Sequence, residues 1–227
     1  MPQHPKYKLP EDLGEEGDEE DFAAEEDETG PSDDLAPGLR PEERGGGGNC
    51  FFHSLVPALN QGNVGGRSSW TQQEVRNKIA QDMETRIPAA DIMDRVDNYL
   101  KPADPGIYGA INTINDLKNL IRNSGGYLGD QFSAFLAEVV FRINIVAVRE
   151  MDFRVGRFVF YNELNPAQGS YIVPIYYPGG HYQALPYVDL ATGRQYAFSW
   201  ADRRNWPDQV KQLIRARYTQ AGRAVDF

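Results

Sequence analysis

The spacing of apolar positions changes from helical to strand-like beyond residue 141 of this 227-residue chain. Before that point, apolar residues recur at intervals of three and four, the period of a helix that buries one face. After it, short runs of β-branched and aromatic residues are typical of strands. Helices are therefore expected at 50–60, 71–83, 89–100, 111–122, 131–141 and 206–218, and strands at 143–148, 158–161, 171–177, 181–187 and 194–200. Helices that precede strands, without a repeating βαβ unit, predict an α+β fold in which N-terminal helices pack on a small mixed β-sheet.

Particular residues mark where several of these helices begin or weaken. Thr71 and Glu74 have the spacing of a capping box, in which each side chain bonds the backbone N–H of the other residue. Asp130 is placed to cap the helix over 131–141. Pro57 lies inside the first helix, so that helix is expected to be short or kinked.

The acidity of the chain is concentrated near its N-terminus. Of the 33 acidic residues, 14 lie within residues 1–34, which contain only two basic ones. The other residues carry 19 acidic and 21 basic side chains, so the net charge of −10 belongs to this segment. A segment so poor in apolar residues cannot bury enough surface to offset its ordering entropy. We therefore expect a disordered tail over 1–44, with a solubilising, autoinhibitory or partner-docking role, and one folded domain over 45–227.

Composition disfavours several classes of protein. No apolar stretch approaches the roughly 18 residues of a membrane span, and no basic stripe with interleaved aromatic residues indicates nucleic-acid binding. One cysteine and three histidines are too few for a closed zinc site. The lone cysteine excludes an internal disulfide, which fits a reducing compartment. We expect a cytoplasmic protein, in the cytosol of a host if the chain is a viral or bacterial effector.

The single cysteine, Cys50, follows a run of four glycines and begins the first predicted helix. A helix N-terminus favours the thiolate, which is the nucleophilic form of cysteine. Acyl transfer also needs backbone N–H groups directed at the developing oxyanion. Because glycine has no Cβ, Gly47 and Gly48, together with Asn49, are able to turn these groups inward as an oxyanion loop. Cys50 is therefore the candidate nucleophile.

A histidine far along the chain is the candidate general base. His181 follows two glycines at the start of the predicted strand 181–187, where it would take the thiol proton and return it to a leaving amine. Gln183, two residues on, projects to the same side of a strand. Its amide oxygen would accept a bond from the second nitrogen of the ring and so orient it.

Each of these residues also has an ordinary structural interpretation. A lone cysteine is usually a small buried side chain, a glycine run is usually a linker, and a lone histidine is usually structural. His53 lies one helical turn after Cys50 and is a second histidine able to perturb the thiol or to share a metal with it. The combined context favours Cys50 with His181.

Three blocks of the sequence, in order, resemble the ovarian tumour (OTU) family of cysteine proteases over about residues 45–188. Gly48-Asn49-Cys50-Phe51-Phe52 is similar to the family signature Asp-Gly-Asn-Cys-Leu-Phe. Gly126-Tyr127-Leu128-Gly129-Asp130 resembles the turn that leads, in the family, into a Leu/Ala-rich helix and a strand. His181-Tyr182-Gln183-Ala184-Leu185 resembles the terminal His-Tyr block.

The resemblance implies a papain-like cysteine protease fold of OTU type and a deubiquitinase. Such an isopeptidase removes ubiquitin or a ubiquitin-like modifier from lysine side chains through a thioester, and its substrates include polyubiquitin chains. The resemblance also implies Cys50 as nucleophile, His181 as general base and no metal or organic cofactor.

Two positions depart from the family pattern. Gly47 stands where the family has an aspartate that helps to hold the oxyanion loop, and Gln183 stands where it has Asp or Asn. Asp189 or an upstream acid would be the alternative third member of a catalytic triad. A neutral Gln183 stabilises an imidazolium less than a carboxylate does, which predicts modest activity.

Two rival hypotheses accompany the deubiquitinase. The same fold would serve as a catalytically inactive ubiquitin-binding module, which Gly47 and Gln183 favour. An unrelated cysteine amidase or hydrolase acting on a small substrate would use the same Cys50 and His181.

Overall fold

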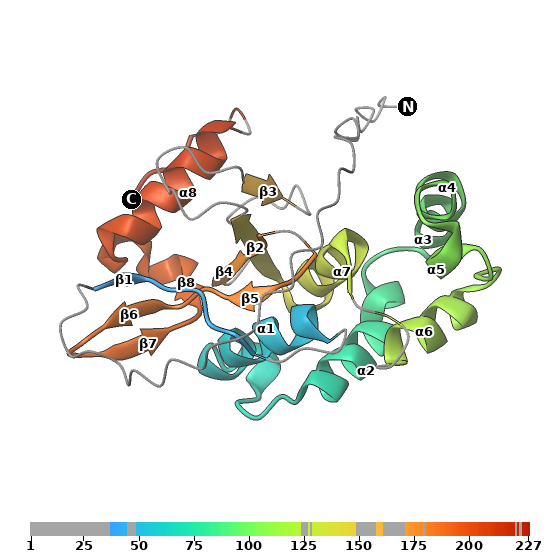
Figure 1. Ribbon diagram of the computed structural model, residues 1–227, viewed down its shortest axis with the longest axis horizontal. Helices are drawn as coiled ribbons and strands as arrows, with labels where there is room; N and C mark the ends of the chain where they lie inside the picture. The colour runs from blue at the N-terminus through green and yellow to red at the C-terminus, as the bar shows by residue number, and fades with distance from the viewer. Residues whose placement is uncertain are drawn as a thin grey trace, which may run out of the picture. The chain divides into compact units, whose positions relative to one another are not determined.

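The computed structural model describes residues 37–44, 49–123, 127, 129–148, 158–160, 171–178, 180–220, 222 and 224–227. These residues belong to the second of two units into which the chain divides, Ala36–Phe227. Within this unit most helices precede the strands (Figure 1), as the apolar spacing predicts. The α+β class, with N-terminal helices on a small mixed sheet, is therefore confirmed.

Helices form most of the described chain between Cys50 and Phe141. In order they are α1 (Cys50–Gln61), the 3₁₀ turn η1 (Val64–Gly66), α2 (Gln72–Asp82), η2 (Met83–Thr85), α3 (Ala89–Arg95), the π-helical turn η3 (Val96–Leu100), α4 (Lys101–Ala103), α5 (Pro105–Tyr108), α6 (Ile114–Arg122) and α7 (Gln131–Phe141). A 3₁₀ segment, η5 (Trp200–Asn205), and α8 (Asp208–Gln220) follow the strands. None of the described helices is long and apolar enough to cross a membrane.

The helix starts follow the local sequence signals. The capping box at α2 is present: the backbone N–H of Thr71 donates to Glu74 over 2.8 Å, and the backbone N–H of Glu74 donates to the hydroxyl of Thr71 over 3.3 Å. Asp130 caps α7 by accepting the backbone N–H of Ser133 over 2.9 Å. Pro57 lies within α1, which nevertheless continues through it to Gln61.

The strands form two sheets. The larger has the order β3-β2-β4-β5 with β8 also paired to β4, and the smaller has the order β1-β6-β7. Their bounds are β1 (Gly38–Leu39), β2 (Ile143–Val148), β3 (Phe158–Phe160), β4 (Tyr171–Tyr176), β5 (Gln183–Ala184), β6 (Tyr187–Asp189), β7 (Gly193–Gln195) and β8 (Phe198–Ser199). The pair β2–β4 is parallel, with Ile143 opposite Tyr171, and the other described pairs are antiparallel.

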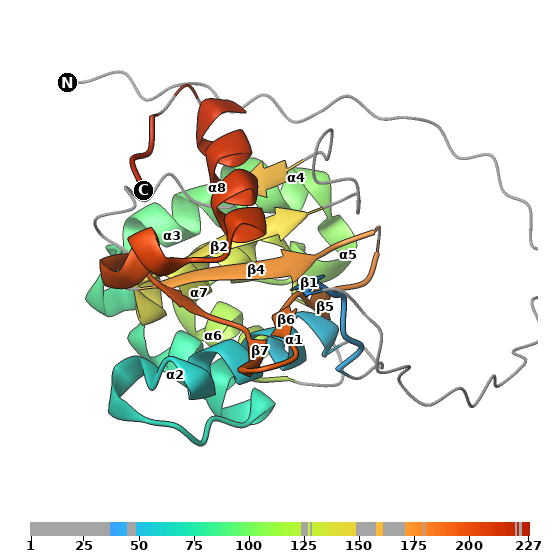
Figure 2. The same ribbon diagram turned by 90° about the vertical axis from the view of Figure 1, so that its left-hand side faces the viewer.

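The larger sheet is covered on both faces. Figure 2 shows α8 on one face and the group containing α7 and α1 on the other. Successive side chains of a strand point to opposite faces. Accordingly Ile143, Ile145 and Ala147 join the core beneath α7, whereas Val146 and Val148 join a second core with α8. This two-sided burial explains why residues 143–148, apart from the buried Asn144, are apolar without alternation.

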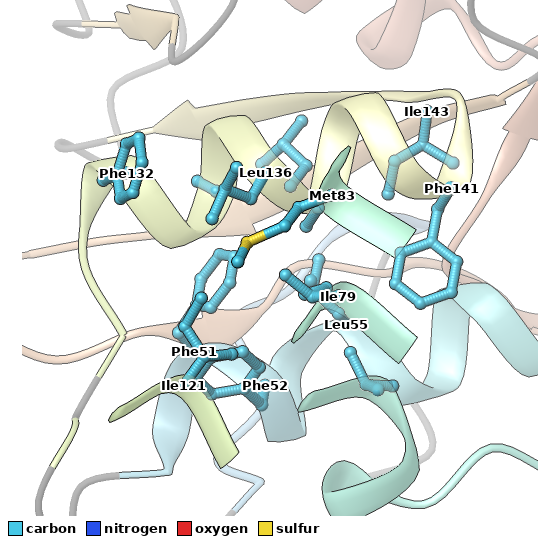
Figure 3. Close-up of a cluster of buried hydrophobic side chains, with 14 of the residues drawn as sticks. Phe51, Phe52, Leu55, Ile79, Met83, Ile121, Phe132, Leu136, Phe141 and Ile143 are labelled. Atoms are coloured by element: carbon cyan, nitrogen blue, oxygen red, sulfur yellow. The ribbon is translucent and has the colours of Figure 1, made fainter. Parts of the chain in front are cut away.

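The larger core fixes the start of α1. Phe51, Phe52 and Leu55 of α1 are fully buried with Ile79 of α2 and Leu136 of α7 (Figure 3). Each buried side chain of this size contributes about 1.5–3 kcal/mol relative to an exposed one. The residue that begins α1 is therefore attached to a rigid element.

Three segment predictions differ from the structure by more than the exact ends of an element. Residues 37–44, assigned to the tail, lie in the folded unit because β1 pairs with β6 and buries Leu39. The predicted strand 181–187 is divided into β5 and β6, and the predicted strand 194–200 into β7 and β8, with η5 starting at Trp200. Short edge strands of two or three residues show too little periodicity to be delimited from sequence. The rest of the predicted tail, 1–36, lies outside the described residues.

Candidate active site

Cys50 is the first residue of α1, and only 6% of it is exposed. Asn49 occupies the N-cap position but makes no capping bond with its side chain, and the first turn contains no acidic residue. The partial positive charge of the helix N-terminus is therefore not offset by an acid in the first turn of α1. Cys50 therefore lies at the positive end of the α1 dipole.

The side chain of Asn49 is bound by α2 instead of capping α1. Its Oδ1 accepts bonds from Nε2 of Gln72, over 2.8 Å, and from the guanidinium of Arg76. Arg76 also donates to the backbone carbonyls of Ile121, over 2.9 Å, and Tyr127, over 2.7 Å. One guanidinium thus joins the residue before the cysteine, the end of α6 and the segment that leads to α7.

Arg76 is a buried cation. No part of it is exposed, and its guanidinium lies 3.8 Å from the ring centroid of Phe52. Burial lowers the pKa of Arg76 to about 10, so the group stays charged at neutral pH. Gly47 and Gly48 lie outside the described residues, and the residue of the predicted oxyanion loop that is described, Asn49, is held by Arg76 and Gln72.

Gly129 places the turn before α7 directly against α1. Its φ is +80°, and a Cβ added there would lie 2.9 Å from Cβ of Phe51 and 3.0 Å from the ring of Phe52. This close approach requires a residue without a side chain. The first and second sequence blocks therefore meet at the residues that follow Cys50.

His181 lies two residues before β5 and not within a strand as predicted. Gly180, directly before it, has a φ of +70°, and β5 begins at Gln183. Nε2 of His181 is 2.7 Å from Oε1 of Glu43, and Nε2 of Gln183 donates to Oε2 of the same carboxylate over 3.0 Å. Glu43 thus bridges the ring and the amide. Gln183 donates to Glu43 in the structure, whereas the sequence predicts that it accepts from His181.

The backbone next to Glu43 is attached to the residue after Gln183. Glu42 and Ala184 exchange two backbone hydrogen bonds of 2.8 and 3.1 Å. Figure 1 shows this N-terminal segment running past β6 and β5 toward α1. The carboxylate of Glu42 accepts the hydroxyl of Tyr196 over 2.6 Å and pairs with Arg44 over 2.8 Å. Partial burial raises the pKa of Glu42, but these bonds outweigh it, so that the pKa is lowered overall.

Aromatic packing joins the histidine segment to the cysteine helix. Tyr182, which follows His181, is 5% exposed and contacts Phe51 edge-on with ring centroids 5.2 Å apart. Tyr177 stacks on the same Tyr182 ring at 4.5 Å. The neighbour of His181 is therefore in contact with the neighbour of Cys50, and residues more than a hundred positions apart are brought together.

The other residues considered from the sequence have different surroundings. Oδ1 of Asp189 accepts the backbone N–H groups of Thr192 and Ala191, each over 2.9 Å, and these bonds lower its pKa. Asp189 therefore holds the β6–β7 turn. His53 is part of α1, and its backbone N–H donates to Asn49 over 2.9 Å. Among the residues that the structure describes, no three of His, Cys, Asp and Glu gather into a metal site.

Glu43 is the functional candidate that no local pattern identifies. It lies in the acidic N-terminal part of the sequence, 138 residues before His181. From the sequence, an upstream acid is only an unspecified alternative to Asp189. The pairing of this segment with β5 decides which acid it is.

A hollow elsewhere in the domain is separate from Cys50. It has a volume of about 480 Å³ and lies at the C-terminal end of α1, where Gln61, Arg194 and Trp206 are among its lining residues. Because α1 rises about 1.5 Å per residue, its two ends are roughly 16 Å apart. The hollow is therefore not the cavity of the candidate site.

No family model matches the sequence, and no curated relative matches it. Among solved structures, the chain is similar to an OTU domain in complex with ubiquitin, with a TM-score of 0.48, 12% identity, and 78% of this chain and 81% of that chain covered. It is also similar to an OTU deubiquitinase from Wolbachia pipientis wMel, with a TM-score of 0.42, 14% identity and coverage of 77% and 96%. A viral OTU domain protease from Dera Ghazi Khan virus has a TM-score of 0.42, 16% identity and coverage of 67% and 83%. These TM-scores lie below 0.5, so the assignment of function depends on the residues of this chain.

Proposed function

We propose that this chain is a cysteine-type deubiquitinating peptidase, which hydrolyses the bond between the C-terminus of ubiquitin, or of a ubiquitin-like modifier, and a lysine side chain. The observation that supports it most is the contact of Tyr182 with Phe51, which joins the segment of His181 to the helix that begins with the single cysteine. A thiol at a helix N-terminus, with a carboxylate-bound imidazole on the adjoining segment, has the parts of a cysteine protease. The three OTU-like sequence blocks support the substrate class.

The proposed reaction proceeds through a thioester. His181 accepts the proton of the Cys50 thiol, and the sulfur attacks the carbonyl carbon at the C-terminus of the modifier. The N–H groups of the loop 47–49 and of Cys50 bind the tetrahedral oxyanion. His181 then gives its proton to the lysine amine, which leaves. Water then attacks the thioester, and His181 takes a proton from this water. The modifier leaves as its carboxylate, and the proton returns to the sulfur to give the free thiol.

The backbone directly before His181 is open to an approaching substrate. A Cβ added to Gly180 would meet nothing within 4 Å, so the backbone is open immediately before the histidine. The C-terminal tail of ubiquitin ends in two glycines, which lack side chains that such an approach would have to accommodate. This openness leaves room for a modifier tail to approach the histidine.

One of the two arguments for an inactive binding module is weakened. That hypothesis depends on Gly47 and on the neutral Gln183 in the third triad position. A carboxylate nevertheless contacts His181, because Glu43 supplies it from the N-terminal segment. The catalytic hypothesis is therefore favoured over the binding module.

The direct test is labelling of the full chain with ubiquitin that carries a C-terminal electrophile. We expect one covalent adduct by intact mass for wild type and none for Cys50→Ala or His181→Ala. His53→Ala, a matched histidine change on α1, is expected to keep the labelling. Parallel probes built on ubiquitin-like modifiers define which modifier is preferred.

Three outcomes distinguish the hypotheses. A folded wild-type protein that reacts with none of the modifier probes would contradict the proposal. Reversible ubiquitin binding without an adduct would favour the binding module. Alkylation of Cys50 by a small reagent, without reaction with any modifier probe, would favour an unrelated cysteine amidase or hydrolase.

A further inference from the structure

We infer that Glu43 is the positioning residue for His181, and that Gln183 positions Glu43 instead of acting on the ring. The inference rests on the proposed function, because it deepens the description of the same site. It replaces the sequence-based assignment, in which Gln183 orients the imidazole. It also makes the segment 38–44, predicted to be part of the tail, a working part of the domain.

The contact with Glu43 determines which ring nitrogen is left for the thiol. A carboxylate only accepts hydrogen bonds, so Nε2 of His181 must carry the proton that it donates to Oε1 of Glu43 over 2.7 Å. The other nitrogen, Nδ1, then has the lone pair that a general base needs. When the ring takes the thiol proton, the same carboxylate stabilises the imidazolium through a charge-assisted bond.

Both oxygens of the Glu43 carboxylate are used. Oε1 contacts the ring, and Oε2 accepts the amide of Gln183 over 3.0 Å. The amide thus limits rotation of the carboxylate, and Gln183 itself begins β5. An isolated surface ion pair between two long side chains lacks such a restraint and is worth little.

The segment that carries Glu43 is fixed at several points. Leu39 donates its backbone N–H to the side-chain oxygen of Gln209 over 3.1 Å, and Arg40 donates to Pro186 over 3.0 Å. Glu42 pairs with Ala184 through two backbone bonds. The nearby cation Arg44 is paired with Glu42, which directs the two neighbouring carboxylates to different partners.

The single cysteine provides a test that needs no modifier. The rate at which iodoacetamide alkylates Cys50, at fixed neutral pH and by intact mass, reports how readily the thiol loses its proton. We expect Glu43→Ala to slow this reaction as His181→Ala does. We also expect kcat on a ubiquitin substrate to fall on the order of 100-fold with little change in KM. This loss is larger than that usual for removing a group that only supports a ligand, and smaller than that for removing the carboxylate of a catalytic triad.

Two further variants separate positioning from general stability. Glu42→Gln removes the same charge from the neighbouring position, which pairs with Arg44 and does not orient the ring, and is expected to stay within about twofold of wild type. The double variant Glu43→Ala with Gln183→Glu places a carboxylate at position 183, the residue that contacts Glu43 in wild type. We expect it to regain at least part of the lost rate, which a purely structural role of Glu43 would not produce.

The inference is overturned if Glu43→Ala alkylates and turns over as fast as wild type, or if Glu42→Gln is as harmful as Glu43→Ala. Its failure is distinguishable from failure of the proposed function. If alkylation depends on Glu43 and His181 while every modifier probe fails, the positioning role stands and the deubiquitinase proposal falls. If the probes label Cys50 regardless of Glu43, the deubiquitinase proposal stands and the positioning role of Glu43 falls.

Discussion

Cys50 and His181 are held in opposite ways. The cysteine begins a helix whose next two residues are completely buried, and the residue before it is bound by a buried arginine. The histidine side chain is 34% exposed and its partner Glu43 is 57% exposed. Packing therefore fixes the nucleophile, whereas hydrogen bonds among three polar side chains orient the ring of the base.

This contrast separates stability from activity. Apolar burial contributes several kcal/mol per large side chain, but exposed polar pairs contribute about 1 kcal/mol or less. Changes on the cysteine side should therefore lower stability and activity together. Changes on the histidine side should lower activity with little loss of stability.

The largest effect on stability is expected from Phe51→Ala. Phe51 is fully buried and contacts both Phe52 and Tyr182, so its removal leaves a cavity between the two sides of the site. We expect the free energy of unfolding to fall by about 3–5 kcal/mol in urea denaturation. Tyr99→Ala, at a residue that is 56% exposed, is the control and should change it by less than about 0.5 kcal/mol. Comparable losses in the two variants would refute the contrast.

Gly129→Ala tests the close approach to the cysteine helix. The change costs about 1–2 kcal/mol for the left-handed conformation and a further 1–3 kcal/mol for overpacking against Phe51. Gly193 has nearly the same φ, +82°, but nothing lies within 4 Å of its added Cβ. Gly193→Ala should therefore lower the free energy of unfolding only by the cost of the left-handed conformation. The difference between the two unfolding free energies measures the packing cost, and a difference near zero would exclude it.

Glu138→Gln tests a buried carboxylate beneath the sheet by its pH dependence. Glu138 is 1% exposed and accepts the backbone N–H of Ile145 over 2.7 Å, a bond that a glutamine oxygen can keep. Burial raises the pKa of Glu138 well above its ordinary value of 4.5. Its stabilising contribution is therefore present below pH 4.5 and is lost as pH rises toward the raised pKa. Relative to the variant, wild type should become less stable from pH 4.5 to 7 in urea denaturation. A constant difference across this range would contradict the raised pKa.

The smallest effect on stability is expected from Glu43→Gln. The substitution keeps the shape of the side chain and removes only the charge at an exposed position. The free energy of unfolding should change by less than about 0.5 kcal/mol, while the rate of Cys50 alkylation falls. Thermal unfolding and alkylation measured on the same preparation check both statements. A loss of stability as large as that of Gly129→Ala would remove the distinction between the two sides.

The features that sequence predicted well are those whose partners lie close along the chain. The box between Thr71 and Glu74 and the cap at Asp130 involve residues three positions apart, so the local pattern contains both donor and acceptor. A second capping box, Thr113 with Asp116, has the same spacing and indicates the start of α6 at Ile114 more accurately than apolar periodicity does. Local chemistry is therefore sufficient to delimit most helices.

Local sequence patterns identify only some residues of the candidate site. Cys50 is identifiable because it is the single cysteine and begins a predicted helix, and His181 because it follows two glycines in an OTU-like block. Gln183 is predicted to belong to the site, but its hydrogen-bond partner is Glu43 and not His181. Arg76 carries no sequence signal for its contact with Asn49, since the pattern of α2 shows only that the position is polar.

The sequence by itself determined the α+β class, the order of helices and strands, and the two residues most suited to thiol chemistry. These depend on residue type, on periodicity and on bonds that span a few positions. Only the tertiary structure decided that Glu43 contacts His181 and that Arg76 contacts Asn49. Those contacts join residues 138 and 27 positions apart, and they form because β1 and Glu42 pair with the later strands and α2 packs on α1. A side chain's distant partner is set by how the surrounding elements pack, which no single segment of the sequence contains.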